Sequence, residues 1–515
     1  MMRTFLLSLA AVAVLFGLEG SARSQKSEND KFEDFDKLTK GAKQYEGLLR
    51  LYHKDEHLYA EIPLHLLNKP LLCPIAIARG LGMGGHTLNF DEQWVLLFQR
   101  EGDKIHLVRR NVHFRAKKDS PASRAVETTY TDSVLEAIRI RAIQPTRRGI
   151  VIDLNDIFMQ DFAELGLGSF DASRSTWFKV KAFPKNIELQ VKATYSGRGP
   201  SDDSVIDDRG RTVVVHYGLV ALPEDGYQPR VADDRVGYFL TAVKDFTSDS
   251  KETSFVRFIN RWRLERADND KDLTRLSPPK KKIVFWIENS VPVEYRKHVR
   301  DGILEWNKAY EKIGFLDAIE VRQQEDEDFD PEDINYNTFR WITNDRGYAM
   351  GPSRANPLTG EILDADIVFD ADMVRYLKHQ YRLYLTGTGQ VEARLEPTSM
   401  IQSARKGWVL PPTSLLAQKG WNDRALFPGN EKDPDNPLSN PRHHLWAVQN
   451  GICQCGAHRR MELGLAAVAM AVRAEGKDNI DAAIEEMIAQ AIKETVMHEV
   501  GHTLGLRHNF KASTM

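Results

Sequence analysis

The sequence predicts an α+β protein of several domains, in which a β-rich N-terminal region is followed by a mixed α/β domain. Three observations support this fold class. Short apolar runs between turn residues fill residues 45–267, a charged stretch with adjacent prolines follows at 268–282, and helical periodicity appears after residue 283. The length of 515 residues suits two to four domains of ordinary size.

The composition is that of an ordinary globular protein. Hydrophobic residues make up 42% of the chain and charged residues 28%, and 70 basic against 73 acidic residues give a formal net charge of −3. A balance of this kind gives no reason to expect nucleic acid or an anionic membrane as a partner.

The first 24 residues have the three-part layout of a secretory signal peptide. An arginine precedes an apolar run from Phe5 to Leu18, and small residues are spaced for cleavage before Gln25. The alternative is an uncleaved anchor helix, for which the run is short. We therefore expect an exported protein, periplasmic or extracellular, with no membrane span after cleavage and a flexible leader over residues 25–44.

Residues 45–267 have the pattern of a β-rich region made of one or two subdomains. Residues 48–64 alternate around a polar turn, and two apolar strands flank the turn Glu101–Lys104, so each segment predicts a hairpin. Further short strands are predicted at residues 149–154, 176–183, 187–196 and 211–222. Residues 268–282 then form a predicted solvated linker, because Pro278 and Pro279 disfavour both helix and sheet.

Residues 283–515 predict the mixed α/β domain. Strands are expected at residues 283–287, 319–322 and 338–343, and a strand, turn and strand over 347–372. One amphipathic helix is predicted from apolar residues at helical spacing, namely Val299, Ile303, Trp306, Tyr310 and Ile313. An irregular insertion is expected at about 381–456 and an alanine-rich helix at 461–473. A last helix begins near residue 480, with one predicted stripe of Ile484, Ile488, Ala491, Thr495, His498 and His502.

The segment HEVGHTLGLRH, from His498 to His508, carries the strongest chemical signal. Residues four apart on a helix share a face, so His498 and His502 direct two imidazoles to one point. Glu499 is close enough to touch a water held at that point. Gly505 allows the left-handed turn that ends a helix, after which the chain can bring His508 to the same place.

Three neutral histidines leave a fourth position for water, as in a catalytic zinc site. Zinc lowers the pKa of such a water to about 7, and we expect Glu499 to accept its proton as general base. Two alternatives are ordinary core and surface histidines, and a structural zinc site, which more often has four protein ligands and no adjacent glutamate.

HEVGHTLGLRH matches the HExxHxxGxxH motif of the metzincin metalloproteases at every fixed position. The strand order before it resembles that of the matrixin-like metzincins. Residues 299–324, 349–372 and 498–513 resemble a family of large secreted bacterial zinc proteases with EcxA-like zinc-binding domains. Residues 255–268 and the β-rich region upstream resemble two domains of unknown function, DUF5117 and DUF5118, that precede the protease in that family.

The resemblance spans about residues 45–515. It implies a zinc metallopeptidase with His498, His502 and His508 as ligands, Glu499 as base and a protein or peptide as substrate. Metzincins place a Met-turn beneath the zinc and build the S1′ wall from the chain beyond it. We expect both in a later segment, so that the zincin domain is C-terminally truncated here and the chain on its own is poorly active, unstable or an inactive fragment.

Ile362, Asp364, Asp366 and Val368 belong to a predicted edge strand, along which an extended peptide substrate would pair. The alternative is an ordinary core strand. The aspartates at 364, 366, 370 and 372 suggest calcium as a second ion, against the alternative of a solvated strand face.

Three cysteines, Cys73, Cys453 and Cys455, leave at least one thiol unpaired within the chain. Cys73 lies in an apolar context, which favours a buried structural residue over a latency thiol that caps the zinc. Cys453, Cys455 and His458 are candidates for a second metal site or a disulfide.

We therefore predict a secreted zinc-dependent endopeptidase. The alternative is an exported β-rich binding protein with a non-catalytic zinc site. For the N-terminal region, the roles of inhibitory prodomain, substrate-binding module and scaffold stay open.

Overall fold

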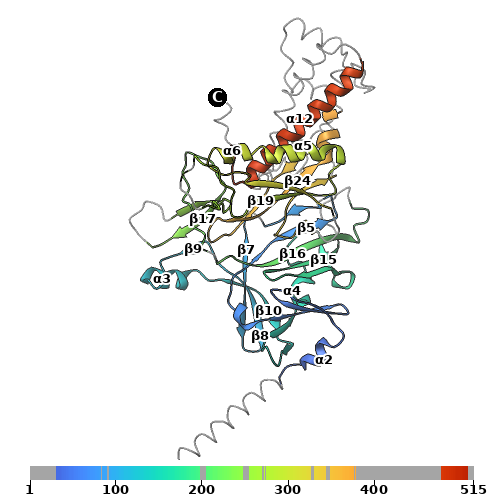
Figure 1. Ribbon diagram of the computed structural model, residues 1–515. Coiled ribbons are helices and arrows are strands. Elements are labelled where there is room, and N and C mark those ends of the chain that lie inside the picture. Colours follow the sequence, from blue (N-terminus) through green and yellow to red (C-terminus); the bar gives the residue numbers. More distant parts are fainter. Residues whose placement is uncertain are drawn as a thin grey trace, which may run out of the picture. The chain divides into compact units, whose positions relative to one another are not determined.

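The structure is a computed structural model of the chain (Figure 1). It describes residues 31–508 apart from residues 83, 90, 91, 198–204, 225, 248–254, 269–271, 273, 326–329, 344–347, 376 and 379–476. The predicted signal peptide, insertion and alanine-rich helix lie outside the described residues, as do Cys453, Cys455 and His458.

The chain divides into two compact units that interleave along the sequence. The first comprises Met1–Ile75, Trp94–Glu224 and Val243–Ser254, and the second Ala76–Gln93, Asp225–Ala242 and Phe255–Met515. The boundaries between these units do not coincide with the linker predicted at residues 268–282. Pro279 of that segment forms an antiparallel β-bridge with Arg266. The predicted domain boundaries stay a prediction.

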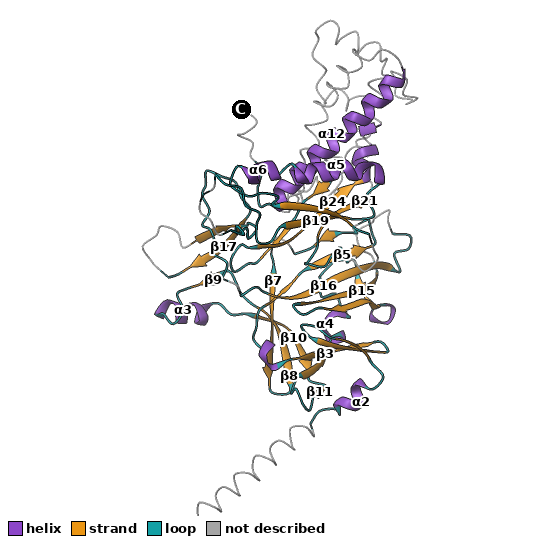
Figure 2. Cartoon of the chain, viewed as in Figure 1, coloured by secondary structure: helices purple, strands orange, loops and turns teal. Residues whose placement is uncertain are grey.

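Strands are the main secondary structure of the first unit, as Figure 2 shows. One sheet has the order β1-β2-β3-β12-β11, and a second contains the path β10-β8-β7-β4-β16-β15-β13, with β14 paired to β15. The strands are β1 (Lys43–Tyr45), β2 (Arg50–Lys54), β3 (His57–Ile62), β4 (Leu71–Cys73), β7 (Trp94–Glu101), β8 (Lys104–Arg109), β9 (Phe114–Arg115), β10 (Ser133–Arg139), β11 (Ala142–Ile143), β12 (Ile150–Asp153), β13 (Ser169–Phe170), β14 (Thr176–Ala182), β15 (Asn186–Ser196) and β16 (Arg211–Ala221).

Both predicted hairpins of the first unit are confirmed. β2 and β3 pair from Arg50 with Glu61 to Lys54 with His57, and β7 and β8 close around Glu101 and Lys104. The four further strands predicted in this region are β12, β14, β15 and β16. Cys73 is fully buried in β4, as expected for a structural cysteine.

The described residues of the first unit also form five short helical segments, namely α2 (Phe35–Thr39), the 3-10 turn η1 (Leu64–Leu66), α3 (Pro121–Thr129), α4 (Asn155–Phe158) and the 3-10 turn η2 (Ala172–Arg174). The described part of the predicted flexible leader is structured. Asp34 caps α2 by accepting a hydrogen bond from the Lys37 amide, and Leu38 packs against Ala142 and Val151.

The second unit contains a mixed sheet with the order β20-β19-β21-β24-β22, in which β23 also pairs with β24. Its strands are β19 (Ile283–Ile287), β20 (Ile319–Gln323), β21 (Asn337–Ile342), β22 (Ala349–Met350), β23 (Ser353–Ala355) and β24 (Ile362–Asp370). They match the strands predicted for residues 283–372. The short strands β5 (Ile75–Arg79) and β6 (His86–Thr87) form a hairpin, and β17 (Leu240–Asp245) and β18 (Phe255–Ile259) precede the sheet.

Among the described residues, the helices α5 (Val293–Leu304), α6 (Asn307–Glu311) and α12 (Lys477–Thr503) accompany this sheet, and residues 371–375 after β24 are also helical. α5 and α12 lie beside each other against the sheet, as Figure 1 shows, and their apolar residues join one core with those of β19, β21 and β24. Gly302 permits the close approach of the two helices, because a Cβ there would lie 2.8 Å from the Lys493 carbonyl oxygen. No helix in the described part of the chain is both long and apolar enough to span a bilayer.

The single amphipathic helix predicted over Val299–Ile313 is wrong in its second half. The chain forms α5 and then the short α6, and Ile313 is 53% exposed. Trp306 at the junction directs its indole N–H to the Met497 carbonyl oxygen at 2.8 Å. The residue is thus used for a polar contact with α12, which an apolar periodicity does not reveal.

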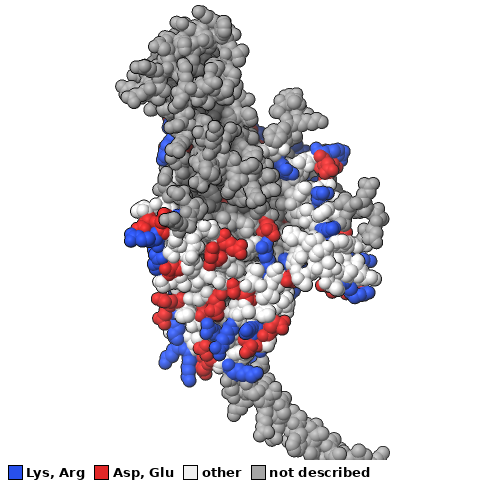
Figure 3. Space-filling model, turned by 180° about the vertical axis from the view of Figure 1, so that it is seen from behind, with Lys and Arg blue, Asp and Glu red and all other residues white. Residues whose placement is uncertain are grey.

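Charged side chains of both signs are interspersed on the described surface drawn in Figure 3. Several form short-range pairs, such as Arg174 with Asp171 at 2.8 Å and Arg235 with Asp233 at 2.6 Å. This mixed pattern is the surface counterpart of the near-zero net charge.

Candidate metal centre

The metal centre is built at the C-terminal end of α12. The buried stripe of this helix is Ile484, Ile488, Ile492, Val496 and Val500, each at most 3% exposed. Of the predicted stripe, Ile484, Ile488, Ala491 and His502 are buried, whereas Thr495 and His498 are partly exposed. His498 and His502 lie four residues apart and therefore one turn apart on one face of the helix.

A glycine turn ends the helix. The Leu506 amide donates to the Gly501 carbonyl oxygen at 3.0 Å, and the Gly505 amide donates to the His502 carbonyl oxygen at 2.9 Å. These are the two hydrogen bonds of a Schellman motif, and Gly505 has the positive φ, +94°, that this motif requires. The chain reverses here, as the motif HExxHxxGxxH predicts.

The reversal brings the third histidine to the other two. His508 Nε2 lies 3.0 Å from His498 Nε2 and 3.1 Å from His502 Nε2. Zn–N bonds of about 2.0–2.1 Å would separate tetrahedral ligands by about 3.4 Å. The three ligand atoms all lie within 4.8 Å of one another, so the donor set fits a zinc ion.

The tautomer of His502 also fits metal binding. Its Nδ1 lies 2.8 Å from the Leu506 carbonyl oxygen, and because a carbonyl only accepts, Nδ1 carries the hydrogen and Nε2 keeps its lone pair. Burial lowers the pKa of His502 to about 4 and also lowers the pKa of His508. Both rings are thus neutral ligands at neutral pH.

Glu499 lies on the helix between the two histidines and is 1% exposed. Two close contacts hold this part of α12. Gly501 faces Trp306, where a Cβ would lie 2.9 Å from the indole ring, and Gly351 faces the backbone of Glu499, where a Cβ would lie 2.4 Å from the carbonyl oxygen. The helix therefore has no room for larger residues at these contacts.

The prediction that Ile362, Asp364, Asp366 and Val368 belong to an edge strand is wrong. β24 pairs in parallel with β21 on one side and antiparallel with β22 and β23 on the other. Its backbone groups are therefore occupied by neighbouring strands. Among the described strands the sheet ends at β22, and the edge nearest the metal centre is the segment Ala349–Ala355, which contains Gly351.

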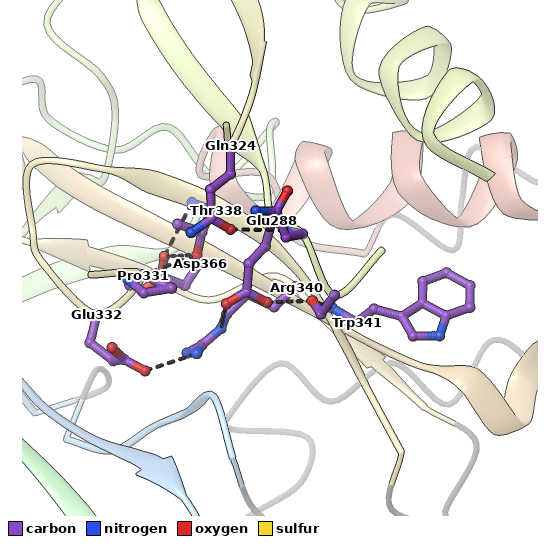
Figure 4. A network of polar contacts seen from close by, with 10 residues as sticks. Glu288, Gln324, Pro331, Glu332, Thr338, Arg340, Trp341 and Asp366 are labelled. Atoms are coloured by element: carbon purple, nitrogen blue, oxygen red, sulfur yellow. Dashed lines mark hydrogen bonds and ion pairs between the residues drawn. The ribbon is translucent and has the colours of Figure 1, made fainter. Parts of the chain in front are cut away.

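The carboxylates of β24 also differ from expectation, because Asp364, Asp366 and Asp370 are buried rather than solvated. Figure 4 shows Asp366 beside Thr338, whose hydroxyl donates to it at 2.5 Å. Asp364 lies 3.8 Å from Arg354, and Asp372 accepts from Arg375 at 2.6 Å. Within the described ranges the grouping suited to a metal is that of the three histidines, so calcium finds no support here.

The same polar cluster extends along β21. Arg340 is nearly buried and lies between Glu332 at 2.8 Å and Glu288 at 3.5 Å (Figure 4). Burial raises the pKa of Asp366 to about 6, and it also raises the pKa of its neighbour Asp364. These acids are thus tied to the stability of the sheet.

Several neighbours of the metal centre were missed in the sequence. Gly351 adjoins Glu499, the Phe239 ring lies 5.8 Å from the His502 ring, and the Trp262 indole N–H donates to the Thr503 carbonyl oxygen at 2.9 Å. These residues lie far from the motif in sequence and have no periodicity that relates them to it.

Comparisons with known proteins agree with this geometry. A family model described as Met-zincin matches residues 481–515. Models of two domains of unknown function match upstream, DUF5118 over residues 32–80 and DUF5117 over residues 89–267. No curated protein and no solved structure matches the chain. The C-terminal segment is therefore similar to Met-zincins, which supports a zinc metallopeptidase.

Proposed function

We propose that this protein is a secreted zinc-dependent endopeptidase of the metzincin type. The observation that carries the proposal is the convergence of three imidazoles beside a buried glutamate at the end of one helix. A structural zinc site would more often have four protein ligands and no neighbouring acid. The proposed export rests on the apolar run from Phe5 to Leu18.

His498, His502 and His508 would hold the ion. A zinc ion bound there would act as a Lewis acid on the scissile carbonyl and on a water molecule. Glu499 would accept a proton from the attacking water and deliver it to the leaving amine as a general acid. The hydrogen bond from His502 to Leu506 keeps the ring in the orientation that this arrangement needs.

An extended peptide would bind along the sheet edge at Ala349–Ala355. β22 and β23 use one side of this segment to pair with β24. A substrate strand added on the other side would pass close to Glu499, since Gly351 lies against the backbone of that residue.

The test is the substitution Glu499→Gln. Loss of a general base costs about 10²–10⁴-fold in rate, so we expect peptide hydrolysis to fall by that factor while the zinc content stays the same. Glu486→Gln is the matched control, because Glu486 is an exposed residue of the same helix that accepts from Gln490 at 3.0 Å. A wild-type protein that binds zinc but cleaves no peptide would instead be a binding protein with a non-catalytic site.

A further inference from the structure

We propose that two segments of the upstream β-rich region, Gly237–Phe239 and Asn260–Trp262, position the ligand loop of the metal centre. Both segments lie within residues 89–267, which match the domain of unknown function DUF5117. They also lie in the same compact unit as the three histidines. The proposal rests on the proposed function, because it takes the three histidines as metal ligands.

The first segment pairs with the ligand loop as a short antiparallel strand. The Phe239 amide donates to the Gly505 carbonyl oxygen at 2.7 Å, and the Arg507 amide donates to the Gly237 carbonyl oxygen at 3.1 Å. Tyr238 forms the antiparallel bridge with Leu506 between these bonds. The backbone that leads to His508 is thus held by residues far upstream in the chain.

This pairing reaches His502 through two contacts. Leu506, the bridged residue, is the one whose carbonyl oxygen accepts the hydrogen bond from His502 Nδ1 at 2.8 Å. The Phe239 ring meets the His502 ring edge-on, with 5.8 Å between centroids and 64° between planes. Partners of this kind fix the tautomer and the direction of a ligand ring.

The second segment supports the first and caps the helix. The Asn260 amide donates to the Phe239 carbonyl oxygen at 2.8 Å, and the Asn260 carbonyl oxygen would lie 2.1 Å from a Cβ at Gly505. The Trp262 indole N–H donates to the carbonyl oxygen of Thr503 at 2.9 Å. That oxygen belongs to the last turn of α12, where helix carbonyls have no partner within the helix.

The second segment is in turn fixed to the sheet. The Arg261 amide donates to the Gly360 carbonyl oxygen at 3.0 Å, and the Ile362 amide donates to the Arg261 carbonyl oxygen at 2.9 Å. A continuous set of backbone hydrogen bonds therefore runs from the start of β24, through both upstream segments, to the loop of His508. The segments act as positioning elements, since their contacts are with the ligand loop and the His502 ring.

The experiment compares Phe239→Ala with Leu240→Ala in the full chain, without substrate. Leu240 is the next residue and is 38% exposed, so its truncation leaves the ring contact with His502 intact. Zinc affinity is measured by competition with a chromophoric chelator, and the visible absorption of the Co²⁺ form reports the ligand geometry. We expect Phe239→Ala to weaken zinc binding by about 10–100-fold and to change the Co²⁺ spectrum, as outer-shell substitutions do, while Leu240→Ala and Phe239→Tyr stay within about twofold.

A second variant keeps the test decisive if Phe239→Ala does not fold. Trp262→Phe removes the indole N–H that caps α12 and also reduces the size of the ring. Trp341→Phe is its control, because it makes the same change in a ring that stacks on Tyr295. We expect a weaker but measurable loss of zinc affinity for Trp262→Phe alone.

The outcomes separate this inference from the proposed function. Folded Phe239→Ala and Trp262→Phe proteins with the zinc affinity and Co²⁺ spectrum of the wild type would overturn the positioning role. A wild-type protein that binds neither ion would overturn the metal centre and the inference together. Normal metal binding that depends on Phe239, in a protein without peptidase activity, would overturn the proposed function and leave the inference supported.

Discussion

Gly505→Ala tests how closely the ligand loop depends on its surroundings. The substitution places a non-glycine residue at a φ of +94°, which costs about 1–2 kcal/mol. The added Cβ would lie 2.1 Å from the Asn260 carbonyl oxygen, where an ordinary C···O contact is about 3.3 Å. The loop must therefore move by about 1 Å.

That movement breaks the 2.7 Å hydrogen bond from the Phe239 amide to the Gly505 carbonyl oxygen, which contributes about 1 kcal/mol. We expect the free energy of unfolding of the metal-free protein to fall by about 2–3 kcal/mol. A displacement of His508 by about 1 Å equals about half the length of a Zn–N bond, so the affinity for zinc should fall by at least about tenfold.

Gly226→Ala is the control, because Gly226 belongs to the same unit, has a φ of +78° and has no atom within 4 Å of a Cβ placed there. It carries the backbone cost alone, about 1–2 kcal/mol, and should leave zinc binding unchanged. Urea unfolding and chelator competition measure the two quantities. Equal losses of stability in both variants, with unchanged zinc affinity, would refute the argument that the loop is sterically fixed.

Three further predictions concern the sheet, its edge and the ion. Burial raises the pKa of Asp366 from 3.8 to about 6, so between these pH values the native state binds a proton that the unfolded state does not. The free energy of unfolding should therefore decrease as pH rises from about 4 to about 6. Asp366→Asn should flatten this pH dependence in urea titrations, and an unchanged slope would contradict the prediction. Gly351→Ala should reduce kcat/KM for peptides by at least about tenfold, because the added Cβ would lie 2.4 Å from the Glu499 carbonyl oxygen and would displace that residue. Gly84→Ala should not reduce kcat/KM, because the atom nearest to its added Cβ is 3.5 Å away. Removal of the metal by a chelator should abolish hydrolysis and lower the thermal midpoint of unfolding. Free zinc at a hundredfold its Kd should then raise the free energy of unfolding by about 2.7 kcal/mol, and a thermal midpoint that does not change with zinc would argue against a resident ion.

The parts of the structure that depend on local sequence were predictable. Alternation of apolar residues around Glu101–Lys104 was enough for the β7–β8 hairpin, and the helical spacing of His498 and His502 was enough for their shared face. Gly505 could be assigned to a turn because few residues other than glycine adopt a positive φ. The three candidate ligands and the neighbouring acid could therefore be named from the local sequence alone.

The parts that depend on distant contacts were not predictable. Whether β24 lies at an edge is decided by β22 and β23, which come earlier in the chain and fold back onto it. The contact between Phe239 and His502 joins residues that share no pattern. Buried aspartates such as Asp364 resemble solvated ones in sequence, because the arginine that balances the charge, Arg354, comes from another strand.

The interleaving of the two units limits how such a protein can be activated. The chain passes from one unit to the other at residues 75–76, 93–94, 224–225, 242–243 and 254–255. In a zymogen whose inhibitory segment forms one continuous piece, a single cut releases that segment. Here a single proteolytic cleavage breaks at most one of the five connections between the units, and the others still join them covalently. Maturation by one cleavage would therefore not release the second unit.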